Sequence, residues 1–563
     1  MLIIPETYGK PNKTLKKFLV EQIVSGLKRK SITRCSAYAE AYRMMGKPFP
    51  GPWTFGHHPW LKGIHDCVAP SIIGQKSAQM GYTEVALNKV FKAVDIDGVS
   101  VLYVLPASTP DASDFSSARF DPALELSQHL SNLFTDVRNV GHKRAGSASL
   151  YIRGSRSRSQ LKSIPVGLVI IDEKDEMVQE NVAMIFERMS GHEEKNNFQI
   201  STPTIDNFGI NIDFKISTQA SWFFKCPCCG RRTRLVFPDC LVLGTEDITD
   251  QKLKDTHLIC KECKGTLHHE DKFNFLSLEN ADWVQAYTDR DIEGFHINQL
   301  YSMTVKPWEI AHLFLKARSN PADEQEFYNS KLGLPHVVEG ARVLEQDIID
   351  CTKTFSKVAR APENSLITMG VDVGTFLHYE IDQWFLDENA LGNDVSLLAK
   401  PRILNEGKIV NFEDLDELMH RFMVQACVID ANPERRKALE FAQRFWGRVR
   451  MCYYGNNIGH SKQIHLHDED EHSLTVDRTS WLDVSLSRFR SNKISLPIDL
   501  SIEYKQHIKA PVRVYEKDKN NNPVGRYITG NEPDHFAHSR NYAEIALPLA
   551  ANLSMAYDLG KIL

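Results

Sequence analysis

The sequence predicts an α/β fold with two separate cores. Two series of short apolar runs support this prediction, because each run is followed by a polar turn. The first series includes VSVLYVLPA and VGLVIIDE, and the second begins at LITMGVDVG. Such runs are typical of strands buried in a parallel sheet, where functional residues follow the carboxyl ends of the strands. A chain of 563 residues is also too long for one ordinary core, so we expect two or three domains.

The composition indicates an ordinary globular protein. The formal net charge is −5, so the overall balance does not point to nucleic acid, and any DNA contact would come from local basic faces. The apolar stretch Ala543–Tyr557 is interrupted by Glu544, Pro548 and Asn552 and is too short to span a membrane. The first 17 residues lack the apolar core of a signal peptide. We therefore expect a cytosolic protein without a membrane partner.

The order of these signals gives the expected domains. Apolar residues recur at helical spacing up to Met45, which predicts a helical lead-in over residues 1–45. The first α/β domain follows over 46–345 and contains a cysteine-rich insert at about 221–270. We expect a linker at 346–363, the second α/β domain at 364–555, and a tail at 556–563.

A degenerate phosphate-binding loop opens the first domain. Such loops normally read GxxxxGK[ST], with backbone amides at a helix start, a lysine over the phosphates and a hydroxyl for magnesium. Here Lys76 stands in place of the first glycine and Tyr82 in place of the lysine, while Gly81 and Thr83 keep their positions. A lysine at the start of the loop can still reach the phosphates if it folds back. Thr83 is the expected magnesium ligand.

A second element strengthens the nucleotide prediction. The apolar run Val166–Glu173 ends in Asp172 and Glu173. An acid for the magnesium shell followed by a base for the attacking water is what phosphate hydrolysis needs. An ordinary buried strand can also end in two acids, but the two motifs in this order favour an ATP and magnesium site.

Two pairs of cysteines predict a zinc site. Cys226 and Cys229 form one C-x-x-C pair, and Cys260 and Cys263 form the other. Four thiolates suit tetrahedral zinc, and a site closed by four protein ligands is structural. Cys228 is a spare cysteine between two ligands. The alternative is a group of reduced cysteines without metal.

Three acids of the second domain predict a metal-dependent centre. Asp372 lies in an apolar strand, Asp430 ends another, and Asp534 and His538 share one face of a closing helix. A buried carboxylate is costly unless something compensates its charge, and a metal would do so. Acids converging from two strands and a helix suit two-metal phosphodiester hydrolysis. A paired structural acid is the alternative for each, and we expect His465–His472 to be a solvated charged run.

Several segments together resemble one family. GQKSAQMGYTE, FSSARFDPAL, RGSRSRSQLKS, VIIDEKDEM and the STPT turn are similar to the large terminase subunit of lambda-type tailed phages, which carries its Walker A lysine moved forward. The resemblance implies a P-loop ASCE-type ATPase domain with an inserted zinc ribbon, followed by an RNase H-like α/β nuclease domain. The implied function is ATP-driven packaging of double-stranded viral DNA into a procapsid and metal-dependent cleavage of the concatemer.

The resemblance also implies roles for single residues. Glu173 would position the attacking water and Arg119 would contact the γ-phosphate, although a surface arginine is an equal alternative. Ser201 and Thr202 would couple hydrolysis to movement. The ATP-binding set would be Trp60, Lys76, Ser77, Gly81, Tyr82, Thr83 and Asp172, with Trp60 stacking on adenine or packing in the core. The basic residues Arg153, Arg156, Arg158 and Lys162 would face DNA or solvent.

The nuclease ligands implied by the resemblance are Asp372, Asp430 and either Asp534 or His538, with Mg²⁺ or Mn²⁺ as the ion. The third ligand stays open, because this chain reads His538-Ser539 where many relatives have an acid followed by a small residue.

The implied partners are a small terminase subunit, the portal protein of the procapsid and further copies of the chain in a ring. The implied location is the host cytoplasm, and the protein is not expected in the mature virion. Two other functions remain open on the sequence. One is a DNA helicase or repair ATPase with a non-catalytic RNase H-like domain. The other is a zinc-ribbon DNA-binding assembly protein.

Overall fold

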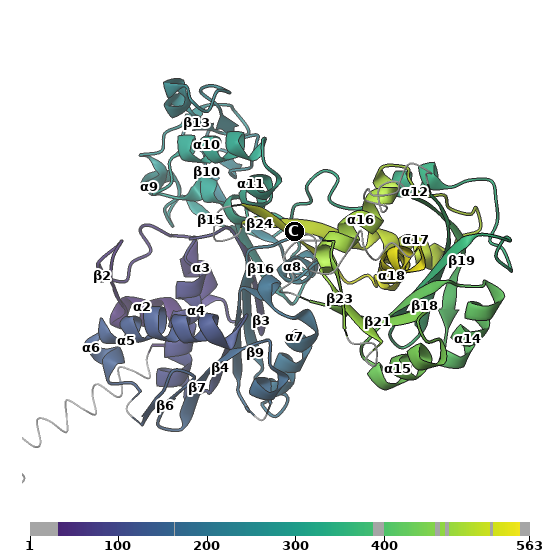
Figure 1. Ribbon diagram of the computed structural model, residues 1–563. Coiled ribbons are helices and arrows are strands. Elements are labelled where there is room, and N and C mark those ends of the chain that lie inside the picture. Colours follow the sequence, from purple (N-terminus) through teal and green to yellow (C-terminus); the bar gives the residue numbers. More distant parts are fainter. Residues whose placement is uncertain are drawn as a thin grey trace, which may run out of the picture. The chain divides into compact units, whose positions relative to one another are not determined.

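The computed structural model describes residues 32–134, 136–162, 164–386, 399–455, 462–467, 472–517 and 522–551. The chain divides into two compact units, Met1–His336 and Val337–Leu563. Each unit has its own sheet flanked by helices (Figure 1), which confirms the prediction of two α/β cores. Most of the predicted helical lead-in, the whole predicted tail and part of the His465–His472 segment lie outside the described residues.

The first unit is built on a largely parallel sheet with the strand order β11-β10-β16-β3-β9-β8-β4-β7-β6-β5, and β15 pairs with β10. Pairing is parallel from β10 through to β7. The central strands are buried because they are apolar on both faces. Their bounds are β3 Ser71–Lys76, β4 Val101–Leu105, β7 Ala148–Gly154, β8 Leu168–Asp172, β9 Asn196–Ser201, β10 Ala220–Lys225 and β16 Glu293–Ile297; the outer strands are β5 Val137–Arg138, β6 His142–Ala145, β11 Arg232–Thr233 and β15 Ala281–Val284.

Helices cover both faces of this sheet. Figure 1 shows α2, α3 and α4 on one side of the edge-on sheet and α7 and α8 on the other. The bounds are α2 Cys35–Tyr42, α3 Leu61–Asp66, α4 Tyr82–Lys92, α5 Asp121–Glu125, α6 Gln128–Ser131, α7 Gln179–Phe186, α8 Ile210–Ile216, α9 Lys272–Phe275, α10 Pro307–Ala317 and α11 Pro321–Glu326. Because the strands are parallel, Lys76, Asp172 and Ser201 all lie at the same edge of the sheet.

The cysteine-rich segment is continuous with this sheet. We expected an insert at about 221–270, but β10 and β11 are strands of the main sheet. The first cysteine pair therefore lies in the turn between two sheet strands. A small separate sheet has three strands in the order β12 (Leu241–Val242), β13 (His257–Ile259) and β14 (Thr266–Leu267). The second cysteine pair lies in the turn between β13 and β14.

The second unit has a mixed sheet with the strand order β19-β18-β17-β20-β21-β23-β22. Strands β17 to β19 are antiparallel, whereas β17, β20, β21 and β23 pair in parallel. Helices α14 and α15 pack on one face and α18 on the other. The bounds are β17 Leu366–Val373, β18 Leu377–Phe385, β19 Lys400–Ile409, α14 Phe412–Arg421, β20 Ala426–Asp430, α15 Arg435–Arg444, β21 Val449–Tyr454, β22 Ile464–Leu466, β23 Ser473–Val476, α16 Arg478–Arg490, α17 Ile502–Lys509, β24 Pro511–Lys517, β25 Pro523–Thr529 and α18 His535–Ala550.

Helix α18 packs unusually close to β17. A Cβ atom placed on Gly370 would lie 2.0 Å from the carbonyl oxygen of Ser539 and 2.2 Å from the amide nitrogen of Ala543. Only glycine permits this approach, because any side chain would clash with helix backbone. The close packing fixes the start of α18 beside the carboxyl end of β17.

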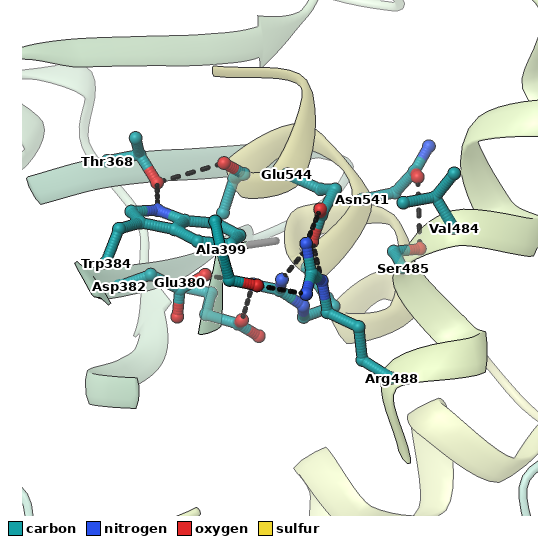
Figure 2. Close-up of polar contacts among 12 residues, drawn as sticks. Thr368, Glu380, Asp382, Trp384, Ala399, Val484, Ser485, Arg488, Asn541 and Glu544 are labelled. Carbon is teal, nitrogen blue, oxygen red and sulfur yellow. Dashed lines mark hydrogen bonds and ion pairs between the residues drawn. The ribbon is translucent and has the colours of Figure 1, made fainter. Parts of the chain in front are cut away.

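A buried charged network also holds α18. Arg540 is fully buried and pairs with Glu380, Asp382 and Glu544. Arg488 of α16 donates to the carboxylate of Glu544 and to the carbonyl oxygen of Ala399. Figure 2 shows the side chain of Arg488 extending towards these two acceptors. Burial raises the pKa of Asp382 to about 6, and it also raises the pKa of Glu380. The two guanidinium groups compensate acids that would otherwise be too costly to bury.

The expected linker is wrong at its start. Residues 346–363 begin inside α12 (Glu345–Cys351), and Ile348 and Cys351 of this helix are core residues of the second unit. They pack with Leu482 and Leu486 of α16. The two units divide earlier, between His336 and Val337.

Within the described ranges, every helix is too short or too polar to cross a membrane.

Candidate active sites

The phosphate-binding loop connects β3 to α4. Lys76 ends β3, and its Nζ lies 2.9 Å from Oε1 of Glu173. Gly81 precedes α4 with φ +88°, and a Cβ there would lie 2.5 Å from Cδ1 of Leu61. The loop therefore needs glycine at this position both for its backbone and for its packing. The hydroxyl of Ser77 is buried and has no hydrogen-bond partner among the described residues.

Trp60 does not have the predicted role of stacking on adenine. Its side chain is fully buried. Its indole N–H donates to the carbonyl oxygen of Met80 over 3.0 Å, and its own carbonyl accepts from Trp283. A ring without exposed surface cannot receive a base, so Trp60 positions the loop from behind.

Tyr82 is also a core residue. Its ring packs against Gly74, where an added Cβ would lie 2.6 Å from Cδ1 of the tyrosine. The side chain is 1% exposed and its hydroxyl has no partner among the described residues. Its side chain is therefore not available to a nucleotide, and any contact with phosphate would involve its backbone.

The acid pair at the end of β8 lies beside the loop. Asp172 is buried and accepts a hydrogen bond of 2.6 Å from the hydroxyl of Tyr103. Burial and the neighbouring negative charge of Glu173 raise the pKa of Asp172 to about 6, and hydrogen bonds from Tyr103 and Thr83 act in the opposite direction. Glu173 has a left-handed backbone with φ +61°. Such strain in a residue other than glycine concentrates at functional sites.

The turn after β9 is bonded to the turn after β8. The Ser201 hydroxyl accepts from the backbone N–H of Asp175 and donates to the carbonyl of Thr202. The Asp175 carboxylate accepts from the backbone N–H groups of Thr204 and Ile210, each at 2.8 Å. Burial raises the pKa of Asp175 to about 7. The sequence prediction missed Asp175, although it lies only two residues after Glu173.

The predicted basic residues are mostly at the surface. Arg119 is exposed, in the π-helical segment Phe115–Phe120, and its charge acts to lower the pKa of Tyr103, the donor to Asp172. The side chains of Arg156, Arg158 and Lys162 are exposed as well. Arg153 is half-buried and donates to the carbonyl oxygens of Gly141 and Ile152.

The four predicted zinc ligands converge. The sulfur atoms of Cys226, Cys229, Cys260 and Cys263 all lie within 4.8 Å of one another. The sulfurs of Cys226 and Cys263 are 3.9 Å apart. Zn–S bonds of about 2.3 Å in a tetrahedron place sulfurs about 3.8 Å apart, so the spacing fits zinc. The Cys228 thiol is exposed and points instead to the carbonyl oxygen of Thr266.

In the second unit, Asp372 and Asp430 lie at the carboxyl ends of neighbouring parallel strands. Val371 and Ile429, the residues before them, are register partners. Burial raises the pKa of Asp430 to about 6, and the negative charge of Asp372 adds to this shift. A buried acid whose pKa is raised by a neighbouring acid is typical of a metal-binding or catalytic centre.

The two candidates for the third ligand pair with each other. Nε2 of His538 lies 3.2 Å from Oδ2 of Asp534, which also accepts from the hydroxyl of Thr529. Burial acts to raise the pKa of Asp534, but the hydrogen bond and charge of His538, together with Arg478, lower it overall. Neither residue belongs to the cluster of metal-ligating atoms around Asp372 among the described residues.

Two histidines complete that cluster instead. Asp372, His378 and His535 offer ligand atoms that all lie within 4.8 Å of one another. Nδ1 of His535 is 2.8 Å from Oδ2 of Asp372. The sequence prediction missed both histidines. His378 would have been found from the hairpin that pairs it with Asp372, and His535 from its place in the same HFAHS segment as His538.

Comparison with solved structures shows the same fold in a phage protein. The crystal structure of the HK97 bacteriophage large terminase is 10% identical and covers 91% of this chain and 99% of its own, with a TM-score of 0.52. Two other large terminases align with lower TM-scores. The large terminase of thermophilic bacteriophage D6E in complex with ADP is 11% identical and covers 84% of this chain and 93% of its own, with a TM-score of 0.29. The large terminase ATPase domain of Thermus phage P74-26 is 16% identical and covers 49% of this chain and 93% of its own, with a TM-score of 0.30.

No curated protein matches the chain. Two family models do, and they divide the chain between them. The ATPase domain of phage terminase large subunit gpA matches residues 47–283, and the endonuclease domain of the same subunit matches residues 292–518. The endonuclease match begins just before β16, a strand of the first unit's sheet. The two matches together cover most of the chain, which belongs to the phage terminase large subunit gpA family and combines an ATPase domain with an endonuclease domain.

Proposed function

We propose that this chain hydrolyses ATP at Lys76, Asp172 and Glu173 to move double-stranded viral DNA into a procapsid, and that it cleaves the concatemer at Asp372 and Asp430. The observation that carries the motor half is the convergence of a lysine, a hydroxyl and two acids at one edge of a parallel sheet. Lys76 contacts Glu173, and the Thr83 hydroxyl acts to lower the pKa of Asp172. The family assignment favours this function over a helicase or an assembly protein.

The roles in hydrolysis follow from chemistry and position. Lys76 would bind phosphate oxygens, and Thr83 and Asp172 would hold Mg²⁺, which neutralises charge on the phosphates. Glu173 would orient the attacking water. The ion pair between Lys76 and Glu173 means that a nucleotide binding to Lys76 would release the Glu173 carboxylate for this task.

The coupling role of Ser201 and Thr202 is supported by their link to the acid-bearing turn. Movement of Glu173 and Asp175 would be transmitted through the bond from Asp175 to Ser201. The exposed residues Arg119, Arg156 and Lys162 would contact phosphate groups of nucleotide or DNA.

The nuclease half needs divalent ions. Bound Mg²⁺ or Mn²⁺ would supply an activated water and stabilise the leaving oxygen. Asp372 and Asp430 would hold the ions at the ends of β17 and β20, while Asp534 would orient His538 beside them. Zinc at the four cysteines would be structural.

By family, the partners would be a small terminase subunit, the portal protein and further copies of this chain in a ring, in the host cytoplasm.

The first test separates the binding of ATP from its hydrolysis. Lys76→Ala should weaken ATP binding, and Glu173→Gln should retain binding but lose at least 99% of DNA-stimulated hydrolysis, which corresponds to about 2.7 kcal/mol or more of barrier.

The control for this test is Glu187→Gln, an acid on the same unit outside the site. It should hydrolyse ATP at the wild-type rate. Hydrolysis by the Glu173→Gln protein at more than a tenth of the wild-type rate would reject Glu173 as the residue that positions water.

A further inference from the structure

We propose that the nuclease centre binds a first-row transition-metal ion through Asp372, His378 and His535, and that these nitrogen ligands make it prefer such an ion to Mg²⁺. The inference rests on the proposed nuclease function and deepens it. The ligand set differs from the set expected from sequence, which was Asp372, Asp430 and either Asp534 or His538.

The fold brings the three residues together from three elements. Asp372 and His378 are direct cross-strand partners at the end of the β17–β18 hairpin. His535 is the first residue of α18, which Gly370 holds against β17. Each residue therefore has a fixed backbone position, and their ligand atoms converge within 4.8 Å.

The two histidine rings lie close together beside Asp372. His378 and His535 stack with centroids 4.6 Å apart and planes 8° apart. Nδ1 of His535 lies 2.8 Å from the Asp372 carboxylate. The ligand atoms are therefore within reach of one ion, and a small rotation of the stacked rings would turn both nitrogens towards it.

His378 supplies independent support. The residue is 3% exposed, and its Nδ1 is buried and has no hydrogen-bond partner among the described residues. Its Nε2 lies 3.9 Å from Oε1 of Glu503. A buried nitrogen without a hydrogen-bond partner is costly, and a metal ion bound to Nδ1 would remove this cost. The position of Glu503 also fits, because a metal-ligating histidine commonly has a carboxylate near its other nitrogen.

The choice of ion follows from the donor atoms. Magnesium prefers oxygen ligands and keeps much of its water, whereas imidazole suits first-row transition ions. Two imidazoles beside one carboxylate therefore shift the preference from Mg²⁺ towards Mn²⁺ and later ions. Asp430, on the neighbouring strand, is placed to add an oxygen ligand to a second position.

A third histidine provides a matched control. The ring centroid of His507 lies 5.7 Å from those of both His378 and His535. It is not part of the ligand group, and its Nδ1 instead accepts the backbone N–H of Phe536. Removing it changes the same histidine cluster without removing a proposed ligand.

The test measures Mn²⁺ and Mg²⁺ binding to the full chain by calorimetry, after zinc has been supplied to the cysteines. His378→Gln and His535→Gln should each weaken Mn²⁺ binding by about tenfold or more and Mg²⁺ binding much less. His507→Gln should bind Mn²⁺ within about twofold of wild type, which is the range expected for an uninvolved residue. His535→Asp should narrow the difference between the Mn²⁺ and Mg²⁺ affinities, because it replaces a nitrogen ligand by an oxygen ligand.

Unchanged Mn²⁺ affinity in both glutamine variants would overturn the proposal. So would a His535→Gln protein that binds Mn²⁺ normally but no longer cuts DNA, because the imidazole would then act on water and not on metal. His535 is partly exposed, so its variant remains a fair test if the buried His378→Gln protein does not fold. Failure of the nuclease function is distinguished separately, since it would appear as wild-type protein that binds Mn²⁺ at the histidines but leaves plasmid uncut.

Discussion

Individual residues differ in how far sequence reveals them. The position of Asp172 and Glu173 at the end of a buried strand was predictable, because an apolar run that stops at acids marks where a strand ends. Trp60 and Tyr82 were not, because a motif gives chain position and does not say whether a side chain faces the ligand or the core. His378 and His535 were missed for a related reason: they approach Asp372 through a hairpin register and a helix start that spacing alone does not show.

The raised pKa of Asp430 predicts how cleavage depends on pH. Its pKa is about 6, above the ordinary value of an aspartate, so the carboxyl is protonated below this pH and cannot bind metal well. At limiting Mn²⁺, cleavage should therefore fall as pH drops through 6, and protonation of His535, whose pKa the Asp372 carboxylate raises, should add to this fall. Plasmid digestion from pH 5 to pH 8 measures this, and constant cleavage across the range would contradict it.

At the scale of elements, α18 is the part of the second unit with the most demanding packing. Its helical nature was evident from sequence. Its buried arginine network was not evident, because Arg540 is far along the chain from Glu380 and Asp382, and sequence spacing does not show that the three pair. In the structure, Arg540 of α18 pairs with both acids of β18. Figure 2 shows Glu380 and Asp382 side by side.

Removing Arg540 should therefore be strongly destabilising. Arg540→Ala leaves the carboxylates of Glu380, Asp382 and Glu544 without their shared partner, and breaking a buried pair costs about 3–5 kcal/mol. Arg421→Ala, which removes an exposed pair with Glu417, should cost about 0.5 kcal/mol or less. Urea unfolding of both variants gives the comparison. Equal losses of unfolding free energy would show that the network is not stabilised as described.

The cysteine turns give another prediction at this scale. Cys229→Ser removes one of four converging sulfurs and should abolish stoichiometric zinc binding, with a lower melting temperature for the first unit. Cys228→Ser, one residue away, should keep both zinc and stability because its sulfur points elsewhere. Atomic absorption on purified proteins measures the zinc. Retention of zinc by the Cys229→Ser protein would exclude this ligand set.

At the scale of the whole molecule, sequence predicted two α/β cores and their order, because apolar runs and turn residues are local signals. It misplaced the boundary between them. The segment after His336 looks polar and irregular, yet Ile348 and Cys351 contribute to the core of the second unit. Whether a short helix packs is decided by distant partners such as Leu482, which periodicity cannot supply.

The central claim for the whole molecule is that it carries two separate catalytic centres, one for ATP and one for DNA. The most direct test is digestion of plasmid by the wild-type chain and its Asp372→Ala form in Mn²⁺, with ATP hydrolysis measured on the same preparations. We expect the wild type to linearise and degrade plasmid, and the Asp372→Ala protein to leave it intact while hydrolysing ATP at the wild-type rate. Cleavage by the Asp372→Ala protein at the wild-type rate would contradict the account.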